Sequence, residues 1–517
     1  MTFPAEQSLS ILGKTRHHDR SRLVGIAQAD RLGHLWMLGK TGTGKSTLLT
    51  RLITSDLHAG RGFMLIDPHG DWVETILDLV PPSRVADTID FNPADTSYPV
   101  ALNPLDTAAG LSAPLLTSSL LSVLKKAWPE FWGPRLEYVL RSSLLTLFSI
   151  KGATLLDLHR LLVDADFRQT LVGRIRDPQL LQFWHQEFGA STKTFRTEAV
   201  SPIVNKSGQY LTTPLVRHII GQRSSAVSFR ALIDQGQVFL ANLAKGRLGE
   251  DVSSLLGSLL VNQLELAALS RMDVPAPERR NVVLSIDEAH LIATLAMVEL
   301  FPEARKFHLG IVLAHQYLDQ LDEALRSALL GNVGTLVVFR VGARDADVLS
   351  QEFGPEFSAL ELVSLPARQA DLTLLVDGTT SRPLSATMLP PPVAQDSRRE
   401  QIIAESRRRY GRPVAEVTRE MLRGWQAEPT GSQQRLHLSA PFAADTPGLS
   451  KTRTDLPRSC GSACTFDASR PDLLRRSPMG RGIAGFSPKG PREVGQGLSP
   501  VKGPRKVFST LCAVMSS

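Results

Sequence analysis

Cysteine is scarce in this chain of 517 residues, and the three that occur, Cys460, Cys464 and Cys512, lie close to its C-terminal end. The preceding part of the chain therefore contains no disulfide framework. Cys460 and Cys464 also lack the second pair of ligands that a structural zinc site needs. We interpret all three as cysteines of a tail, without a metal-binding role.

Long apolar runs are missing as well. No stretch of eighteen or more apolar residues is free of charge, and the N-terminus lacks the charged, apolar and small-residue regions of a signal peptide. The sequence thus predicts a cytoplasmic protein without a transmembrane segment.

A net positive charge is missing from most of the chain, although the formal net charge of the whole chain is +7. From Asp396 onward there are 21 Lys and Arg against 11 Asp and Glu, so residues 1–395 sum to about −3. The larger part of the chain therefore has no overall basic character of the kind that indicates a nucleic-acid partner. A basic tail can hold a polyanion, but such a stretch is commonly a solvated, disordered segment.

Short apolar runs alternate with helical patterns over much of the sequence. The first run, 35–38, precedes a glycine-rich loop and a helical pattern over 46–57. Further runs that predict buried strands lie at 61–66, 86–91, 238–241, 282–286, 310–314 and 335–340. Strands that alternate with helices predict an α/β fold with a mostly parallel sheet and right-handed crossovers.

Other patterns interrupt or follow this alternation. Residues 111–230 show helical periodicity without a convincing strand, which predicts an all-helical insertion. Two runs at 372–376 and 384–388, separated by Asp377-Gly378, predict a hairpin at the edge of the sheet. Two amphipathic helices are predicted at 398–409 and 414–425, and the Ser-, Pro-, Gly- and Arg-rich remainder is predicted to be disordered.

The expected domain organisation follows from these patterns. We predict a RecA-like P-loop NTPase domain in two parts, 31–110 and 231–395, which flank the helical insertion 111–230. An N-terminal basic segment, 1–30, precedes this domain. A C-terminal helical segment, 396–428, and a disordered basic tail, 429–517, follow it.

The glycine-rich loop matches the full Walker A pattern, and it stands between a predicted strand and a predicted helix. In such a loop, backbone amides and the N-terminus of the helix cradle phosphate groups. Lys45 would reach the β- and γ-phosphates of ATP, and the Ser46 hydroxyl would bind Mg²⁺. A chance match is the alternative, and the strand and helix make it a poor one. The predicted nucleotide-binding residues are Gly39, Lys40, Thr41, Gly42, Thr43, Gly44, Lys45, Ser46 and Thr47.

A second motif consists of the apolar run 282–286 and the two carboxylates that follow it, Asp287 and Glu288. Asp287 at the tip of a strand can hold the Mg²⁺ shell, and Glu288 can polarise the attacking water. Two acids after a strand can also be the cap and first turn of a helix. Beside a P-loop we favour a Walker B motif, and Glu288 favours hydrolysis over phosphate transfer.

Three motifs together resemble the HerA/FtsK superfamily of P-loop ATPases. They are Gly39-Lys40-Thr41-Gly42, Asp67-Pro68-His69-Gly70-Asp71 and Gly310-Ile311-Val312-Leu313-Ala314-His315-Gln316. The helical insertion is similar to that of the TraG/TraD-like type IV secretion coupling proteins. The resemblance extends over residues 11–411 and implies an ATP-driven DNA translocase that works as a homo-hexameric ring with secretion or DNA-processing machinery.

The resemblance also implies roles for single residues. Gln316 matches a polar sensor of the γ-phosphate, although a strand-end amide can instead cap the next helix. Arg305 matches an arginine finger that acts on the ATP of a neighbouring subunit. The alternative is a solvated arginine beside Lys306, and Arg340 and Arg344 are rival candidates for the finger.

Some residues stay without a firm role. Asp67 and His69 either support the nucleotide site or shape the turn after the second predicted strand. Arg135 lies in a segment typical of coupling proteins. It has either a role that the sequence does not reveal or an ordinary salt bridge, and we favour neither. Only about 38 residues precede Gly39, which is too few for the membrane helices of coupling proteins or the β-barrel of HerA-type proteins. We therefore expect a soluble motor.

The preferred function is thus an ATP- and Mg²⁺-dependent DNA translocase that acts in conjugation, mobile-element transfer or DNA processing. An alternative is an ATP-gated switch or scaffold that assembles with nucleotide and does not move DNA. This alternative agrees with the slightly negative net charge of residues 1–395. A small-molecule phosphotransferase is a weaker possibility, because no acceptor site is apparent.

Overall fold

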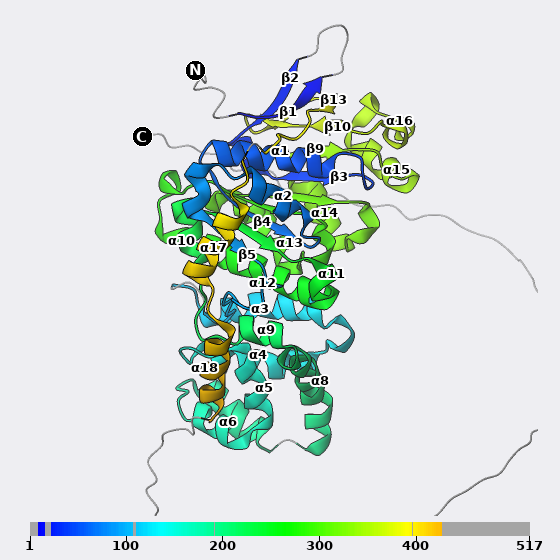
Figure 1. The fold of residues 1–517 in the computed structure, drawn as a ribbon. Helices are drawn as coiled ribbons and strands as arrows, with labels where there is room; N and C mark the ends of the chain where they lie inside the picture. Colours follow the sequence, from blue (N-terminus) through cyan, green and yellow to red (C-terminus); the bar gives the residue numbers. More distant parts are fainter. Residues whose placement is uncertain (1–8, 16–21, 107–109, 191, 395, 427–517) are drawn as a thin grey trace, which may run out of the picture. The chain divides into compact units, whose positions relative to one another are not determined.

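An 11-stranded sheet organises the fold (Figure 1), and its strand order is β2-β1-β13-β10-β9-β3-β8-β7-β4-β6-β5. The seven strands from β9 to β5 are parallel, whereas β10, β13, β1 and β2 extend the sheet with antiparallel pairing. The strands are β1 Leu9–Thr15, β2 Leu23–Ala27, β3 Leu35–Leu38, β4 Gly62–Asp67, β5 Thr88–Phe91, β6 Val238–Asn242, β7 Val282–Ile286, β8 Leu309–His315, β9 Thr335–Val338, β10 Gln369–Thr373 and β13 Leu384–Met388. A separate small hairpin joins β11 Leu375–Val376 to β12 Thr379–Thr380.

The computed structural model describes residues 9–15, 22–106, 110–190, 192–394 and 396–426. The described residues belong to one compact unit, Met1–Gln434. The predicted disordered tail, 429–517, lies outside the described residues, and so do the three cysteines.

Helices cover both faces of the parallel strands, because successive side chains of a strand point to opposite faces. In β3, Leu35 and Met37 belong to one hydrophobic core, and Trp36 and Leu38 belong to the other. The first core also contains side chains of α1 Lys45–His58, α2 Asp71–Leu79 and α17 Arg399–Tyr410. The second contains side chains of α10 Phe229–Gln235, α12 Glu250–Leu269, α13 Leu295–Ala304, α14 Glu323–Asn332 and α15 Ala343–Glu352. The short α16 Ala359–Ser364 packs against α15.

Between β5 and β6, the described residues form helices and connecting turns but no strand. Figure 1 shows α4, α5, α6 and α8 grouped together. The helices of this stretch before α10 are α3 Ala113–Ala127, α4 Pro134–Phe148, α5 Leu155–Val163, α6 Ala165–Val172, α7 Pro178–Gln182, α8 Lys193–Thr212 and α9 Pro214–Ile220. With α10, the helices between β5 and β6 extend over Ala113–Gln235.

One helix in the described part of the chain is long and apolar enough to cross a bilayer. It comprises α12 and the turn after it, Glu250–Asp273, and 83% of its apolar window is buried within the fold. This burial is typical of the central helix of a protein core.

Two predictions about the sheet edge were wrong. The N-terminal segment contains two strands of the main sheet, β1 and β2, whose side chains Leu12, Val24 and Ile26 are buried. The hairpin of β10 and β13 does not close the sheet, because β13 pairs with β1 and β2 forms the edge. One partner of β1, the strand β13, comes from the other end of the domain, so no local pattern revealed this pairing.

The C-terminal helical segment consists of α17 and α18 Val414–Gln426. Arg399 of α17 forms salt bridges with Glu74 and Asp78 of α2, at 3.0 and 2.6 Å. The helix α18 instead contacts α9 and borders a small cavity of about 170 Å³ in the insertion. The segment therefore contacts both the sheet domain and the insertion.

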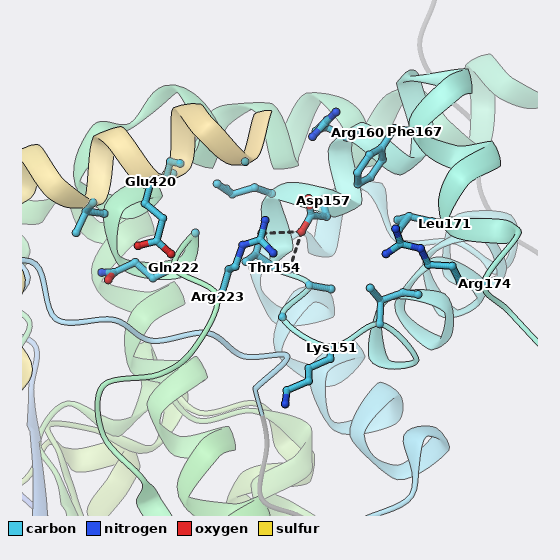
Figure 2. A pocket seen from close by; sticks show the side chains of 18 residues that line it. Lys151, Thr154, Asp157, Arg160, Phe167, Leu171, Arg174, Gln222, Arg223 and Glu420 are labelled. Carbon is cyan, nitrogen blue, oxygen red and sulfur yellow. Dashed lines mark hydrogen bonds between the residues drawn. The ribbon is translucent and has the colours of Figure 1, made fainter. Parts of the chain in front are cut away.

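Figure 2 shows this small cavity, which is lined by Glu420 of α18 and by Arg223 of the insertion. The amino group of Lys151 points away from the guanidinium groups of Arg160 and Arg174, so these cations do not converge on one point. Glu420 pairs with Arg412 at 2.8 Å. The charged groups around this cavity are thus dispersed and do not form one binding position.

Candidate functional site

The P-loop connects β3 to α1, and its backbone conformation depends on glycine. Gly44 has φ 126°, and a Cβ atom there would lie 3.2 Å from Cα of Arg368 and 3.0 Å from the ring of Phe339. Gly42 has φ 77°, in the left-handed region, and a Cβ atom there would meet nothing within 4 Å. The loop is thus packed closely at Gly44 and open at Gly42, as a loop that binds phosphates with its backbone must be.

Lys45 is the first residue of α1 and is 7% exposed. Its ammonium group donates a hydrogen bond to the Gly39 carbonyl at 2.6 Å. Burial lowers the pKa of Lys45, and the negative charges of Asp287 and Glu288 oppose this shift. The cation of the P-loop therefore faces the two acids of the second motif.

The strand order explains how distant motifs meet. β8 lies between β3 and β7, with Leu38 opposite His315 and Ile286 opposite Leu313. β4 lies on the other side of β7. Parallel strands end at the same edge, so the loops after β3, β8, β7 and β4 all lie at the carboxyl edge of the sheet. This edge brings together the P-loop, Gln316, the Asp287-Glu288 pair and Asp67.

Glu288 is 6% exposed and adopts a left-handed backbone conformation with φ 47°. Its Oε1 atom accepts a hydrogen bond from Nε2 of Gln316 at 2.7 Å. Its Oε2 atom lies 3.4 Å from Nδ1 of His290. A left-handed conformation is uncommon for a residue other than glycine and is often associated with functional sites. The structure thus fixes the direction of this carboxylate through Gln316.

Asp287 lies close to two other acidic side chains, Glu288 and Asp67. Burial, Glu288 and Asp67 together raise its pKa to about 6, and Lys45 opposes them. A divalent cation would relieve this repulsion. The described residues contain no group of three or more His, Cys, Asp or Glu side chains that could hold a metal ion by themselves. Mg²⁺ needs only one or two protein groups when phosphates and water complete its shell, so Asp287 and Ser46 fit it.

Asp67 is fully buried, and its carboxylate accepts three backbone hydrogen bonds. The donors are the N–H groups of His69, Trp72 and Val73, at 2.8, 2.8 and 3.1 Å. These bonds satisfy the N-terminus of α2 and shape the turn after β4. Of the two interpretations of Asp67, the geometry therefore supports the turn-shaping one, while its charge also affects Asp287.

The predicted residues face a cleft of about 850 Å³. Its lining includes Thr41, Gly42, Gly44, Lys45, Ser46, Thr47, Asp287, Glu288 and Gln316, whereas the remaining predicted P-loop residues belong to the loop but not to this lining. The sequence did not indicate Ala367, Arg368, Pro391, Pro392, Thr50 and Trp72, which also line the cleft. Arg368 has φ 62° and donates its backbone N–H to the Thr43 carbonyl at 2.7 Å. Arg368 directly precedes β10, and no motif of the sequence indicated it.

Arg305 lies at the opposite edge of the sheet. It begins a 3-10 turn, Arg305–Phe307, directly before β8, whereas Gln316 follows the same strand. A strand of seven residues is about 23 Å long. The Arg305 side chain is exposed, and no salt bridge involves it among the described residues, whereas the neighbouring Lys306 pairs with Glu303. Arg305 is therefore remote from the cleft of its own chain.

The rival arginines lie at the carboxyl edge. The Arg340 carbonyl accepts a hydrogen bond from Lys40 N–H at 2.9 Å, so Arg340 follows β9 directly beside the P-loop. Arg344 is 92% exposed and lies 3.6 Å from a carboxylate oxygen of Asp319. Arg135 pairs with Glu198 within the insertion. None of these three side chains lines the cleft.

Comparison with solved structures shows a shared fold. The chain is 18% identical to the bacterial conjugative coupling protein TrwBdeltaN70. The match covers 73% of this chain and 89% of that one, with a TM-score of 0.54. The plasmid coupling protein TrwB in complex with ADP and Mg²⁺ gives 18% identity, 72% and 88% coverage and a TM-score of 0.52. VirB4 of Thermoanaerobacter pseudethanolicus gives 14% identity, 74% and 96% coverage and a TM-score of 0.50. The predicted RecA-like α/β fold is thereby confirmed.

Comparison of the sequence with curated proteins finds no match. The sequence model of a protein family, described as type IV secretion-system coupling protein DNA-binding domain, matches residues 23–357. This range includes the P-loop, the helical insertion, Asp287, Glu288, Arg305 and Gln316. Because the match extends over more than half of the sequence, the chain belongs to the type IV secretion-system coupling protein DNA-binding domain family.

Proposed function

We propose that this protein is an ATPase that moves DNA as a homo-hexameric ring in conjugative or mobile-element DNA transfer. The observation that carries the proposal is the convergence of Lys45, Asp287, Glu288 and Gln316 on one cleft. Family membership supports the DNA partner. A cytoplasmic location and an association with secretion machinery are parts of the same proposal.

The chemistry follows from the side chains of the cleft. The backbone amides of the P-loop and the ammonium group of Lys45 bind the phosphates of ATP. Asp287 and Ser46 would hold Mg²⁺, which would neutralise charge on the phosphates. Glu288 accepts a proton from the attacking water and orients it. Gln316, which is bonded to Glu288, would register the loss of the γ-phosphate and transmit it to the residues after β8.

A ring is supported by the separation between Arg305 and the cleft. An arginine at the amino edge of the sheet cannot reach the phosphates bound at the carboxyl edge of its own chain. In a ring, the amino edge of one subunit would face the carboxyl edge of the next, and Arg305 would then stabilise charge in the transition state. Arg340 and Arg344, on the same edge as the P-loop, are weaker candidates for this role.

DNA binding does not require a positive net charge over residues 1–395. Phosphate contacts by local lysines and arginines inside a ring would give binding that is independent of sequence and strongly dependent on salt. The charge of about −3 over residues 1–395 supports the alternative function, an ATP-gated switch or scaffold. Slow hydrolysis that is unaffected by DNA, and ATP-dependent assembly that survives Glu288→Gln, would favour this alternative.

The deciding experiment measures ATP hydrolysis with and without DNA at low salt, together with the native mass of the protein with ATP. The motor predicts a ring and a rate that rises with DNA and falls with salt. Lys45→Ala serves as the control and should abolish the DNA-stimulated rate. A wild-type protein that stays monomeric and hydrolyses ATP equally well without DNA would contradict the proposal.

A further inference from the structure

Side chains of two helices hold the segment that follows Glu288. Lys126, in the last turn of α3, donates hydrogen bonds from its ammonium group to two carbonyls of this segment. The acceptors are the carbonyl oxygens of His290, at 3.0 Å, and Ala293, at 2.6 Å. Hydrogen bonds from a charged donor are stronger than neutral ones, so this clamp is a strong contact between the insertion and the second motif.

Two serines of α12 bind the two carbonyls that lie between those of His290 and Ala293. Ser254 Oγ donates to the Leu291 carbonyl at 2.6 Å, and Ser258 Oγ donates to the Ile292 carbonyl at 2.9 Å. Four consecutive carbonyls, 290–293, thus accept bonds from side chains of helices outside the segment. Such complete external binding leaves the segment little freedom to move independently of α3 and α12.

The clamped segment connects directly to Glu288. The Glu288 carbonyl accepts a hydrogen bond from Leu291 N–H at 3.0 Å, which closes the 3-10 turn Ala289–Leu291. The ring of His290 faces the Glu288 carboxylate at 3.4 Å. A shift of the His290 carbonyl therefore changes the position of both the Glu288 backbone and a ring beside its carboxylate.

The side chain of Lys126 is partly buried, and its ammonium group is enclosed by protein. Burial lowers its pKa to about 8, and Asp322 opposes this shift. The preceding residue, Lys125, is exposed. An enclosed ammonium group is costly unless it makes good hydrogen bonds, so the two bonds to the clamped segment account for its position.

We propose that Lys126 is a positioning residue through which the helical insertion controls the alignment of Glu288. The inference rests on the proposed ATPase function and adds the coupling element to it. α3 is the first helix of the insertion, and Ser119 of α3 hydrogen-bonds to Asn262 of α12, so the two clamping helices are joined. A ligand that moves the insertion would reach the hydrolytic site through this clamp.

The test compares Lys126→Met with Lys125→Met in the full-length protein. Lys126→Met removes both hydrogen bonds and keeps an unbranched apolar side chain, whereas Lys125→Met removes an exposed charge from the same helix turn. We expect Lys126→Met to lower kcat for ATP about 10- to 100-fold with KM changed less than twofold, since a displacement of about 1 Å at a reacting group has an effect of this order. Lys125→Met should leave kcat within twofold of the wild type.

Two further variants separate positioning from general stability. Lys126→Arg keeps a cationic donor and should restore part of kcat, and Ser254→Ala should lower kcat less than Lys126→Met does, with KM unchanged. Equal kcat values for Lys126→Met and Lys125→Met would overturn the inference. Loss of nucleotide binding or folding in Lys126→Met, together with normal kcat in Ser254→Ala, would also overturn it. A wild-type protein without ATP hydrolysis would instead refute the proposed function itself.

Discussion

The two edges of the parallel sheet differ in whether their candidate site residues contact one another within one chain. At the carboxyl edge, Lys45 faces Asp287 and Glu288, and Gln316 bonds to Glu288. At the amino edge, Arg305 is exposed and makes no salt bridge among the described residues. One edge thus contains groups that bind each other, and the other presents a cation that lacks an anionic partner.

This difference suggests a division of labour. The groups at the carboxyl edge are within reach of a nucleotide bound to the same chain, so they are expected to act in cis. A group on the far side of a strand about 23 Å long can act on ATP only from another copy of the chain. The comparison can be tested by changing residues on each edge and measuring whether the effects cross between subunits.

The largest effect is expected for Arg305→Ala. Arginine fingers contribute factors of about 10³–10⁵ to kcat, so this variant should hydrolyse ATP at least about 10³-fold more slowly and should still bind ATP. Steady-state ATPase and nucleotide-binding measurements would show both. Lys306→Ala, which changes the neighbouring exposed cation, is the matched control and should be nearly normal.

Mixing variants shows whether Arg305 acts between subunits. Arg305→Ala and Lys45→Ala subunits should partly restore activity together, because each can supply the group that its neighbour lacks. If no mixing ratio gives more activity than the separate variants, Arg305 does not act across an interface, and the contrast between the two edges loses its functional meaning.

Glu288→Gln should have the next largest effect. Loss of the group that accepts the proton from water reduces kcat by about 10²–10⁴, whereas the phosphate-binding groups are unchanged. The variant should therefore bind ATP with normal affinity and remain in the ATP-bound state. Rapid turnover by Glu288→Gln would show that another group activates the water.

A smaller loss is expected for Gln316→Ala. It removes the hydrogen bond to the Glu288 carboxylate, and a hydrogen bond to a charged group contributes about 1.5–3 kcal/mol. We expect kcat to fall about 10- to 100-fold, with little change in ATP affinity. Gln351→Ala, an exposed change on α15, is the control. A normal rate for Gln316→Ala would show that the hydrogen bond to Glu288 does not contribute to hydrolysis.

A last prediction concerns the stability of the scaffold that carries both edges and not the rate of hydrolysis. Glu265 of α12 is 8% exposed, and burial together with Glu299 raises its pKa to about 7. Between about pH 4.5 and pH 7 the folded state binds this proton and the unfolded state does not, so the stability of the fold decreases as the pH rises through this window. Glu265→Gln should therefore stabilise the protein at pH 8 by at most about 3 kcal/mol, and much less at pH 5.

Thermal unfolding at the two pH values measures this difference. Glu278→Gln, at an exposed position, should give the same Tm as the wild type at both. An equal effect of Glu265→Gln at pH 5 and pH 8 would show that Glu265 does not keep its proton in the fold.

The local sequence predicted much of the carboxyl edge and both C-terminal helices. The P-loop, the two acids after β7 and the helices α17 and α18 have short patterns that depend only on neighbouring residues. The boundaries of α18 differ from the predicted 414–425 by a single residue. The contact between Gln316 and Glu288 was not predictable in this way, because it depends on β8 lying between β3 and β7.

The sequence by itself predicted which residues carry the chemistry that we propose for ATP hydrolysis, since glycine conformations, strand ends and helix starts are set by nearby residues. Only the tertiary structure decided that β1 and β2 extend the sheet, that Gln316 bonds to Glu288, and that Lys126 holds the segment after Glu288. These features depend on pairing and packing between segments far apart in the chain, which are selected by the burial of the whole core.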